Sequence, residues 1–214
     1  MIVKPVSHNI VVIGKNFRPN IFSDYWLIKH KIVDENSFTG PKVATDEIAT
    51  LSAGPFDLLV TPDRVQLILR SGHAYSELEE PLKNILGACD GYSYVAIGLN
   101  HAWILTPDGS GDIGDFTRTN FRGTSKFAEA TSAGHESVAS WGMIVNRPWR
   151  KWMMKTKAEP AFKNAVPSTA PEALLVDFNF NRPIQSSSEA IDSLSDLTNS
   201  YDQTVQIANS LTMV

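Results

Sequence analysis

The stretch GYSYVAIGLNHAWIL, which runs from Gly91 to Leu105, decides the fold. Successive side chains of an extended chain point to opposite faces of a sheet. The pattern therefore predicts a long strand in which Asn100 lies on the side of Tyr94 and His101 lies on the aliphatic side. Such a strand needs partners on both edges, so the rest of the chain is interpreted around it.

Cys89, the only cysteine, stands just before this strand, and with His101 it suggests a nucleophilic pair. A reactive thiol needs a base within reach and a lowered pKa. Cys89 instead follows a predicted helix, whose C-terminal end disfavours a thiolate, and Asp90 adds a negative charge. His101 lies twelve residues further along an extended chain. We therefore expect both residues to be structural.

Apolar spacing and turn residues predict the elements before this strand. The expected elements are a strand over Asn9–Ile13, a helix over Pro19–Val33, a strand over Glu47–Ala53, a hairpin of Phe56–Val60 and Arg64–Leu69, and a helix that follows a capping box at Ser76–Glu79.

The second half has fewer apolar positions at its start. The expected elements are a polar, glycine-rich loop over Pro107–Asn120, strands over His135–Asn146 and Arg150–Lys157, a proline-containing loop over Pro160–Pro171, a strand over Leu174–Phe180 and a long helix that begins at Ser186.

These elements predict an α+β fold: a mainly antiparallel sheet with two helices in the N-terminal half and a long C-terminal helix packed on it. We expect residues 1–214 to form a single α+β domain, with a subdivision near 107–134. The phrases FDLLVTPDRVQLIL, VAIGLNHAWIL and LLVDFNF resemble a scattered group of uncharacterised bacterial α+β proteins. That resemblance implies the fold and brings no activity with it.

The composition is that of a globular protein, with 43% hydrophobic and 20% charged residues. A formal net charge of -4 does not suggest a nucleic-acid binder as a whole. A lone cysteine fits a reducing compartment. There is no apolar run long enough for a membrane helix and no signal-peptide pattern, so we expect a cytoplasmic protein that does not enter a membrane.

Motifs for cofactors and metals are missing from the sequence. The five histidines stand at no metal-ligand spacing, and the loop Asp108–Asp112 departs from a calcium loop at Ile113 and Thr119. GSGDIG, at Gly109–Gly114, has glycines at the phosphate-loop positions, but no apolar helix pattern follows it. We therefore expect no cofactor, no metal and no catalytic residue of a known motif.

The strongest local feature is RPWRKWMMKTK, Arg147–Lys157, which combines five cations with two tryptophans and no acid. Tryptophan, arginine and methionine are enriched where proteins bind one another, whereas cations interleaved with rings also suit single-stranded nucleic acid. An amphipathic hairpin with no partner is the third interpretation. The expected partner-binding residues are Arg147, Trp149, Arg150, Lys151, Trp152 and Lys155.

The sequence thus favours a non-enzymatic protein-interaction subunit of a larger prokaryotic or phage-related assembly, with another protein or a further copy of the chain as partner. Two alternatives stay open. One is a hydrolase-like enzyme whose site is assembled from distant residues. The other is a nucleic-acid-binding accessory domain that uses residues 147–157.

Overall fold

The computed structural model describes residues 1–109, 111–121, 140–162 and 170–212. Its centre is a sheet of nine strands in the order β2-β3-β4-β5-β1-β6-β9-β8-β7, and every pairing between these strands is antiparallel. The strands are β1 (Ile2–Lys15), β2 (Val43–Ala44), β3 (Ala49–Ala53), β4 (Phe56–Thr61), β5 (Arg64–Leu69), β6 (Ser93–Thr106), β7 (Met143–Trp149), β8 (Trp152–Ala161) and β9 (Ala173–Pro183). The predicted α+β fold is confirmed.

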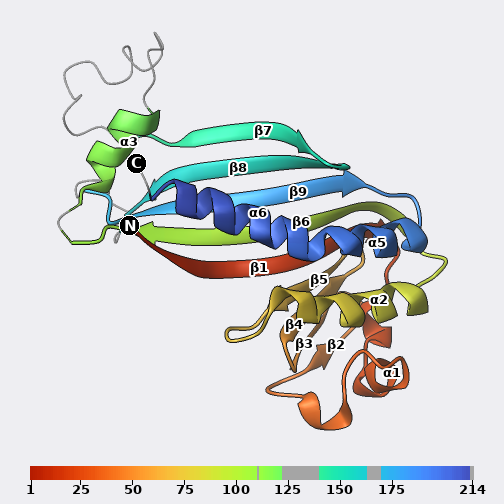
Figure 1. Ribbon diagram of the computed structural model, residues 1–214. Helices are drawn as coiled ribbons and strands as arrows, with labels where there is room; N and C mark the ends of the chain where they lie inside the picture. Colours follow the sequence, from red (N-terminus) through yellow and green to blue (C-terminus); the bar gives the residue numbers. More distant parts are fainter. Residues whose placement is uncertain (110, 122–139, 163–169, 213–214) are drawn as a thin grey trace.

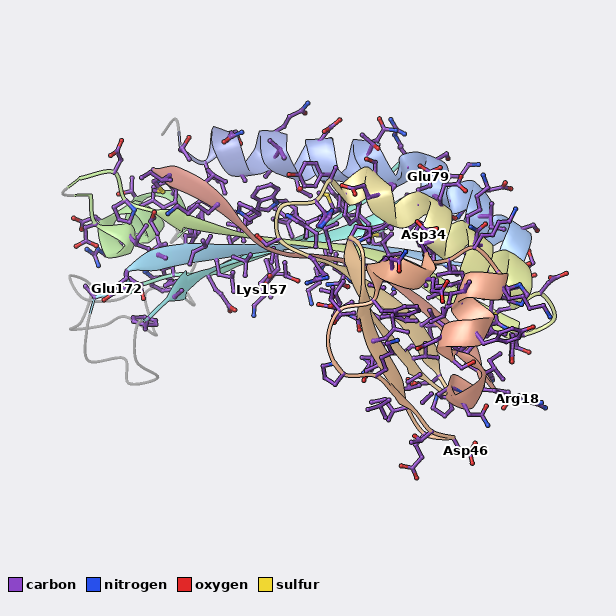
Figure 2. All side chains as sticks on the ribbon, turned by 90° about the horizontal axis from the view of Figure 1, so that it is seen from below. Arg18, Asp34, Asp46, Glu79, Lys157 and Glu172 are labelled. Carbon is purple, nitrogen blue, oxygen red and sulfur yellow. The ribbon has the colours of Figure 1, made fainter. Side chains whose placement is uncertain are left out.

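The α-helices are α1 (Asp24–Lys29), α2 (Glu79–Ala88), α3 (Ile113–Phe121), α5 (Ser187–Ser193) and α6 (Leu197–Ser210). Short 3-10 turns precede α1, α2 and α6, and the last of these, Leu194–Asp196, joins α5 to α6. Figure 1 shows α6 and α5 lying across the long strands β6 and β9, with α2 beside them. In Figure 2 the labelled Lys157 of β8 lies on the opposite side of the strands.

The sheet therefore has a covered face, beneath the helices, and an open face. The strand β6 shows the difference residue by residue: Ile97, Leu99, His101, Trp103 and Leu105 are buried, whereas the residues that alternate with them are only half-buried. The alternation arises because neighbouring side chains of a strand point to opposite faces. His101 lies on the aliphatic side, where the sequence placed it.

The first predicted helix is shorter than its apolar spacing suggested. A 3-10 turn at Pro19–Ile21 comes first, and α1 begins after Ser23, whose Oγ accepts the N–H of Trp26 at 3.4 Å. Lys31 has a φ of 57°, which ends the helical path and turns Ile32 and Val33 into the core. The expected helix over Pro19–Val33 is therefore wrong at both ends.

The glycine-rich loop predicted over Pro107–Asn120 is also wrong in its second half, which forms α3. The Oδ1 of Asp112 accepts the N–H of Asp115 at 3.1 Å and so satisfies one of the free N–H groups at the helix start. Ile113 and Thr117, one turn apart, are both buried. The sequence interpretation missed this helix because its buried stripe includes a threonine.

The C-terminal helix begins as predicted, after Ser186, whose Oγ accepts the N–H of Glu189 at 3.2 Å. The capping box expected at Ser76–Glu79 is displaced: Glu77, and not Ser76, supplies the cap, and its Oε1 accepts the N–H of Ala74 at 2.6 Å. The segment 122–139, which contains His135 and the second part of the expected subdivision near 107–134, lies outside the described residues.

Candidate functional site

The predicted partner-binding segment forms the hairpin of β7 and β8. Trp149 pairs with Trp152 across a two-residue turn, in which Arg150 has a φ of 52°. A two-residue turn with positive φ matches the twist of antiparallel strands. The hairpin therefore places Trp149 and Trp152 side by side and Arg150 and Lys151 at its tip.

Three of the six predicted residues attach the tip to the rest of the chain. Asp196, between α5 and α6, accepts the indole N–H of Trp152 at 2.9 Å and pairs with the guanidinium of Arg150. Trp149 is half-buried: its ring lies 4.8 Å from the ring of Phe180, and its N–H donates to Gln203 at 3.3 Å. Trp152 is only 3% exposed and belongs to the core.

The other three predicted residues, Arg147, Lys151 and Lys155, are exposed, and no ion pair joins them to any part of the chain that the structure describes. The structure does not gather them in one cluster. Arg147 pairs with Met154 on the side of the covered face, and Lys155 pairs with Asn146 on the open face. These cations surround the hairpin from both sides.

The outer strand β7 adds an apolar part to this surface. Met143, Ile144 and Val145 are 40%, 56% and 39% exposed, and β7 is the last strand in the sheet. Met153 of β8, which pairs with Pro148, is also exposed. We call β7 together with the exposed residues of β8 the hairpin edge; sequence reasoning found its cations but not the apolar strand beside them.

Cys89 has the structural environment that the sequence suggested. It is 1% exposed at the end of α2, and its backbone carbonyl accepts the hydroxyl of Tyr94 at 2.8 Å. Burial raises the pKa of the Cys89 thiol to about 12, which leaves it protonated at neutral pH. A neutral, covered thiol is a poor nucleophile.

The open face carries a row of amides that the sequence did not indicate. Asn9, Asn100 and Asn179 are paired across β1, β6 and β9. The Nδ2 of Asn100 donates to the Oδ1 of Asn9 at 2.9 Å, and the Nδ2 of Asn179 donates to the Oδ1 of Asn100. Each donated proton in this row therefore has an acceptor on the next strand.

The covered face carries a cluster of polar side chains. The sequence did not predict that its members lie together. His8 of β1 and His101 of β6 are directly opposite each other in the strand register, and their Nδ1 atoms are 3.2 Å apart. The Nε2 of His101 lies 3.2 Å from the Oγ of Ser200 on α6. The Nε2 of His8 is buried and has no hydrogen-bond partner.

Aromatic rings enclose the two imidazoles. The ring centroids of Trp103, Tyr201 and Tyr75 lie 5.0, 5.2 and 6.1 Å from that of His8. Burial lowers the pKa of His8 to about 4. It lowers the pKa of His101 still more clearly, and the proximity of His8 acts in the same direction. Both imidazoles are therefore neutral at pH 7.

A cleft of about 420 Å³ opens beside His8. Its walls come from the start of β1, the connection between β5 and α2, and the N-terminal end of α6, which carries Thr198, Tyr201 and Asp202. A volume of this size is in the range of small-molecule sites. Only the register of β1 against β6 could have indicated this site, because His8 and His101 are 93 residues apart in the chain.

No protein-family model matches this chain, and no curated protein matches it in sequence. Among the residues that the structure describes, no three side chains of the metal-binding types come together as a set of ligands. The same residues include no helix with the length and apolar character needed to cross a membrane.

Proposed function

We propose that this protein is a non-catalytic interaction subunit that binds an acidic, extended segment of a partner protein along the hairpin edge. The observation that carries the proposal is the exposed strand β7, which combines Met143, Ile144 and Val145 with the free cations beside it. The assembly that we expect is a prokaryotic or phage-related one.

The geometry of β7 supports binding by strand addition. An outer strand presents N–H and C=O groups to which another strand can pair. Natural proteins usually protect such edges with charges, prolines or a covering element. In β7 the central residues Ile144 and Val145 are apolar and exposed, and only Arg147 and Pro148, near the turn, are of the protective kinds.

The charges favour an acidic partner. Arg150 is neutralised by Asp196 and Lys157 by Glu159, but Arg147, Lys151 and Lys155 keep their charge exposed. A segment with apolar residues on alternate positions and acids between them would cover Ile144 and pair with these cations. Complementary charges of this kind mainly raise the association rate and the selectivity of an interface.

The tryptophans argue against the nucleic-acid alternative. Bases stack on exposed ring faces. Trp152 is buried, and Trp149 lies against Phe180 with the guanidinium of Arg150 5.0 Å from its ring. The two rings that suggested a stacking platform are therefore occupied by the protein itself.

Within the described residues, the hydrolase alternative finds no nucleophile beside the two imidazoles that a substrate could reach. Ser200 lies next to His101, but it is 0% exposed and its hydroxyl donates to the carbonyl of Leu197 at 2.7 Å. In the part of the chain that the structure describes, no hydroxyl or thiol lies within hydrogen-bond distance of the free nitrogen of His8. An attacking group needs both a base and access to its substrate.

The test is photo-crosslinking in cells of the natural host. A photoreactive phenylalanine is placed at Ile144, and the matched control carries it at Val6, which is equally exposed at 56% but belongs to β1. We expect one protein to crosslink at position 144 and not at position 6. The double change Lys151→Glu and Lys155→Glu should remove that crosslink and leave the circular dichroism spectrum unchanged.

Two results would contradict the proposal. Equal capture at positions 144 and 6 would mean that the hairpin edge has no selectivity. Capture that disappears after nuclease treatment, and that falls steeply between low and moderate salt, would instead support the nucleic-acid alternative, because counterion release dominates such binding.

A further inference from the structure

The protons of the His8–His101 pair can be assigned from its hydrogen bonds. The hydroxyl of Ser200 donates to the carbonyl of Leu197 at 2.7 Å, so its oxygen is left to accept from the Nε2 of His101. A neutral His101 that carries its proton on Nε2 has a bare Nδ1. That Nδ1 accepts the proton on Nδ1 of His8, 3.2 Å away.

The assignment leaves the Nε2 of His8 as a bare lone pair. A neutral imidazole has one protonated and one bare nitrogen, and the proton of His8 is already committed to His101. His8 is 6% exposed, its Nε2 has no partner, and the residue forms part of the wall of the 420 Å³ cleft. A buried acceptor without a donor is costly, which favours a ligand that supplies one.

The other polar groups of the cleft show which kind of donor fits. Asp202 lines the cleft, is exposed, and makes no ion pair with the described part of the chain. Arg70, the cation of the opposite wall, is held by Asp57, by Thr39 at 2.8 Å and by the carbonyl of Gly54 at 3.3 Å. The hydroxyl groups that line the cleft can donate or accept, so the charged group that still lacks a partner among the described residues, Asp202, decides that a cation fits better than an anion.

The aromatic surroundings favour the same ligand. Electron-rich ring faces attract cations. Tyr201 lines the cleft together with His8, and Trp103 lies behind them. Because burial keeps the pKa of His8 at about 4, the imidazole brings no positive charge to repel a cation at neutral pH.

We propose that this cleft binds a small organic ligand through a protonated amine, which donates a hydrogen bond to Nε2 of His8 and has its charge balanced by Asp202. The apolar part of the ligand lies against Val6 and Leu69 in the same cleft. The site is separate from the hairpin edge and does not depend on the proposed function.

The first test reads the tautomer directly. Nitrogen-15 spectra of the histidine rings at neutral pH should show Nδ1 of His8 protonated and Nε2 bare. A protonated Nε2 would overturn the proposal, because that atom would then be a donor and would repel an ammonium group.

The second test uses three probes of the same shape: n-butylammonium, n-butanol and butyrate. We expect n-butylammonium alone to shift the Nε2 resonance of His8 in a saturable manner at millimolar concentrations. The amine should also shift the methyl resonances of Val6, which lines the same cleft, and this second shift should vanish in His8→Phe. Asp202→Asn, an exposed change that leaves the core intact, should weaken the binding about three- to fivefold, as for an exposed ion pair.

Asp192→Asn is the matched control, because it removes the same charge from α5 outside the cleft. It should leave the titration unchanged. A saturable response to butyrate or to n-butanol equal to that of the amine, no response to the amine, or an equal loss in Asp202→Asn and Asp192→Asn would each overturn the proposal.

Discussion

Asn100 and His101 are neighbours in β6, yet they belong to two different chemical environments. Asn100 points to the open face, where its amide lies between Asn9 and Asn179 and water can reach the row. His101 points to the covered face, where its ring lies between His8 and Ser200. The amide row ends at the half-buried Asn9 and the exposed Asn179, whereas the imidazole row ends at a buried nitrogen without a partner among the described residues.

This difference teaches that the face of a strand, and not the residue type, decides what a polar side chain does. On the open face an unmet hydrogen bond can be made to water at little cost. On the covered face a polar group without a hydrogen-bond partner lowers the stability of the fold, because the group has lost its water and gained nothing in return. The following experiments would break or sharpen this contrast between the two faces.

The largest effect is expected from removing a side chain between the helices and the covered face. Leu194 is 2% exposed, so Leu194→Ala should lower the free energy of unfolding by about 2–5 kcal/mol. The matched control Leu175→Ala, on the open face, removes a half-buried leucine and should cost roughly 1 kcal/mol. Urea denaturation measures both values.

Equal losses in these two variants would contradict the asymmetry of the sheet. A second comparison is the deletion of the chain from Ser186 onward. If the shortened protein stayed folded with an unchanged melting temperature, α5 and α6 would be a detachable arm and the long strands would have no covered face.

Acid should destabilise the covered face in a predictable direction. The pKa of His8 is about 4 in the folded protein and about 6.5 as an unperturbed value, so between these pH values only the unfolded chain binds the proton. The stability that neutral His8 contributes is therefore present above pH 6.5 and is lost as the pH falls towards 4. The loss is about 3 kcal/mol, since one pKa unit corresponds to about 1.4 kcal/mol.

The measurement is the free energy of unfolding of the protein and of His8→Phe over this pH range. The stability of the variant should depend less on pH, and identical slopes would contradict the assignment.

Asp177, on the open face, should affect stability in the opposite direction. Burial raises the pKa of Asp177, against the influence of Lys157, so protonation of this carboxyl favours the folded state. Asp177→Asn should therefore steepen the loss of stability on acidification.

Cys89→Ser tests whether burial alone marks a functional group. Cys89 is as buried as His101, but it does not line the cleft beside His8. We expect the change to cost at most about 2 kcal/mol and to leave the crosslink at Ile144 and the amine titration intact. Complete loss of either in a stably folded variant would show that the thiol has a role.

The smallest effect is expected on the open face. Asn100→Ala removes both hydrogen bonds of the amide row and should cost about 1 kcal/mol, because water can replace part of what is lost. A double-mutant cycle of Asn9→Ala with Asn100→Ala measures the coupling between the two amides. A cost as large as that of Leu194→Ala would mean that the row is as closed to water as the core.

The sequence predicted β3, β4 and β5 well because their patterns are local. The expected strands His135–Asn146 and Arg150–Lys157 were misplaced, since β7 spans Met143–Trp149 and β8 spans Trp152–Ala161. Alternation correctly placed His101 on the aliphatic side, and the turn Thr61-Pro62-Asp63 correctly joined β4 to β5. Tyr94 was wrongly placed on the side of Asn100: a register shift between Tyr94 and Ala96 interrupts the alternation, and Tyr94 is buried like Ile97.

The end of α1 and the whole of α3 were harder to predict. The end of α1 depends on the positive φ of Lys31, and α3 depends on an Asp112 cap that resembled part of a loop.

The cleft could not be predicted for a different reason. It requires the register of β1 with β6, the position of α6 over both, and the hydroxyl of Ser200, which is 99 residues from His101. None of these leaves a local pattern in the sequence. The hairpin edge lies between these cases: composition indicated its cations, but only the strand order shows that β7 is the outer strand.

The strand order also affects the sequence of events during synthesis. The ribosome makes β1, β5 and β6 first, and these strands pair with one another. One edge of β6, and the whole apolar face that α5 and α6 cover, must wait for β9 and the helices that follow it. A nascent chain is therefore most exposed to aggregation just before β9 emerges. The same late arrival of Ser200 and Tyr201 means that His8 and His101 acquire their final surroundings only after α6 has been made.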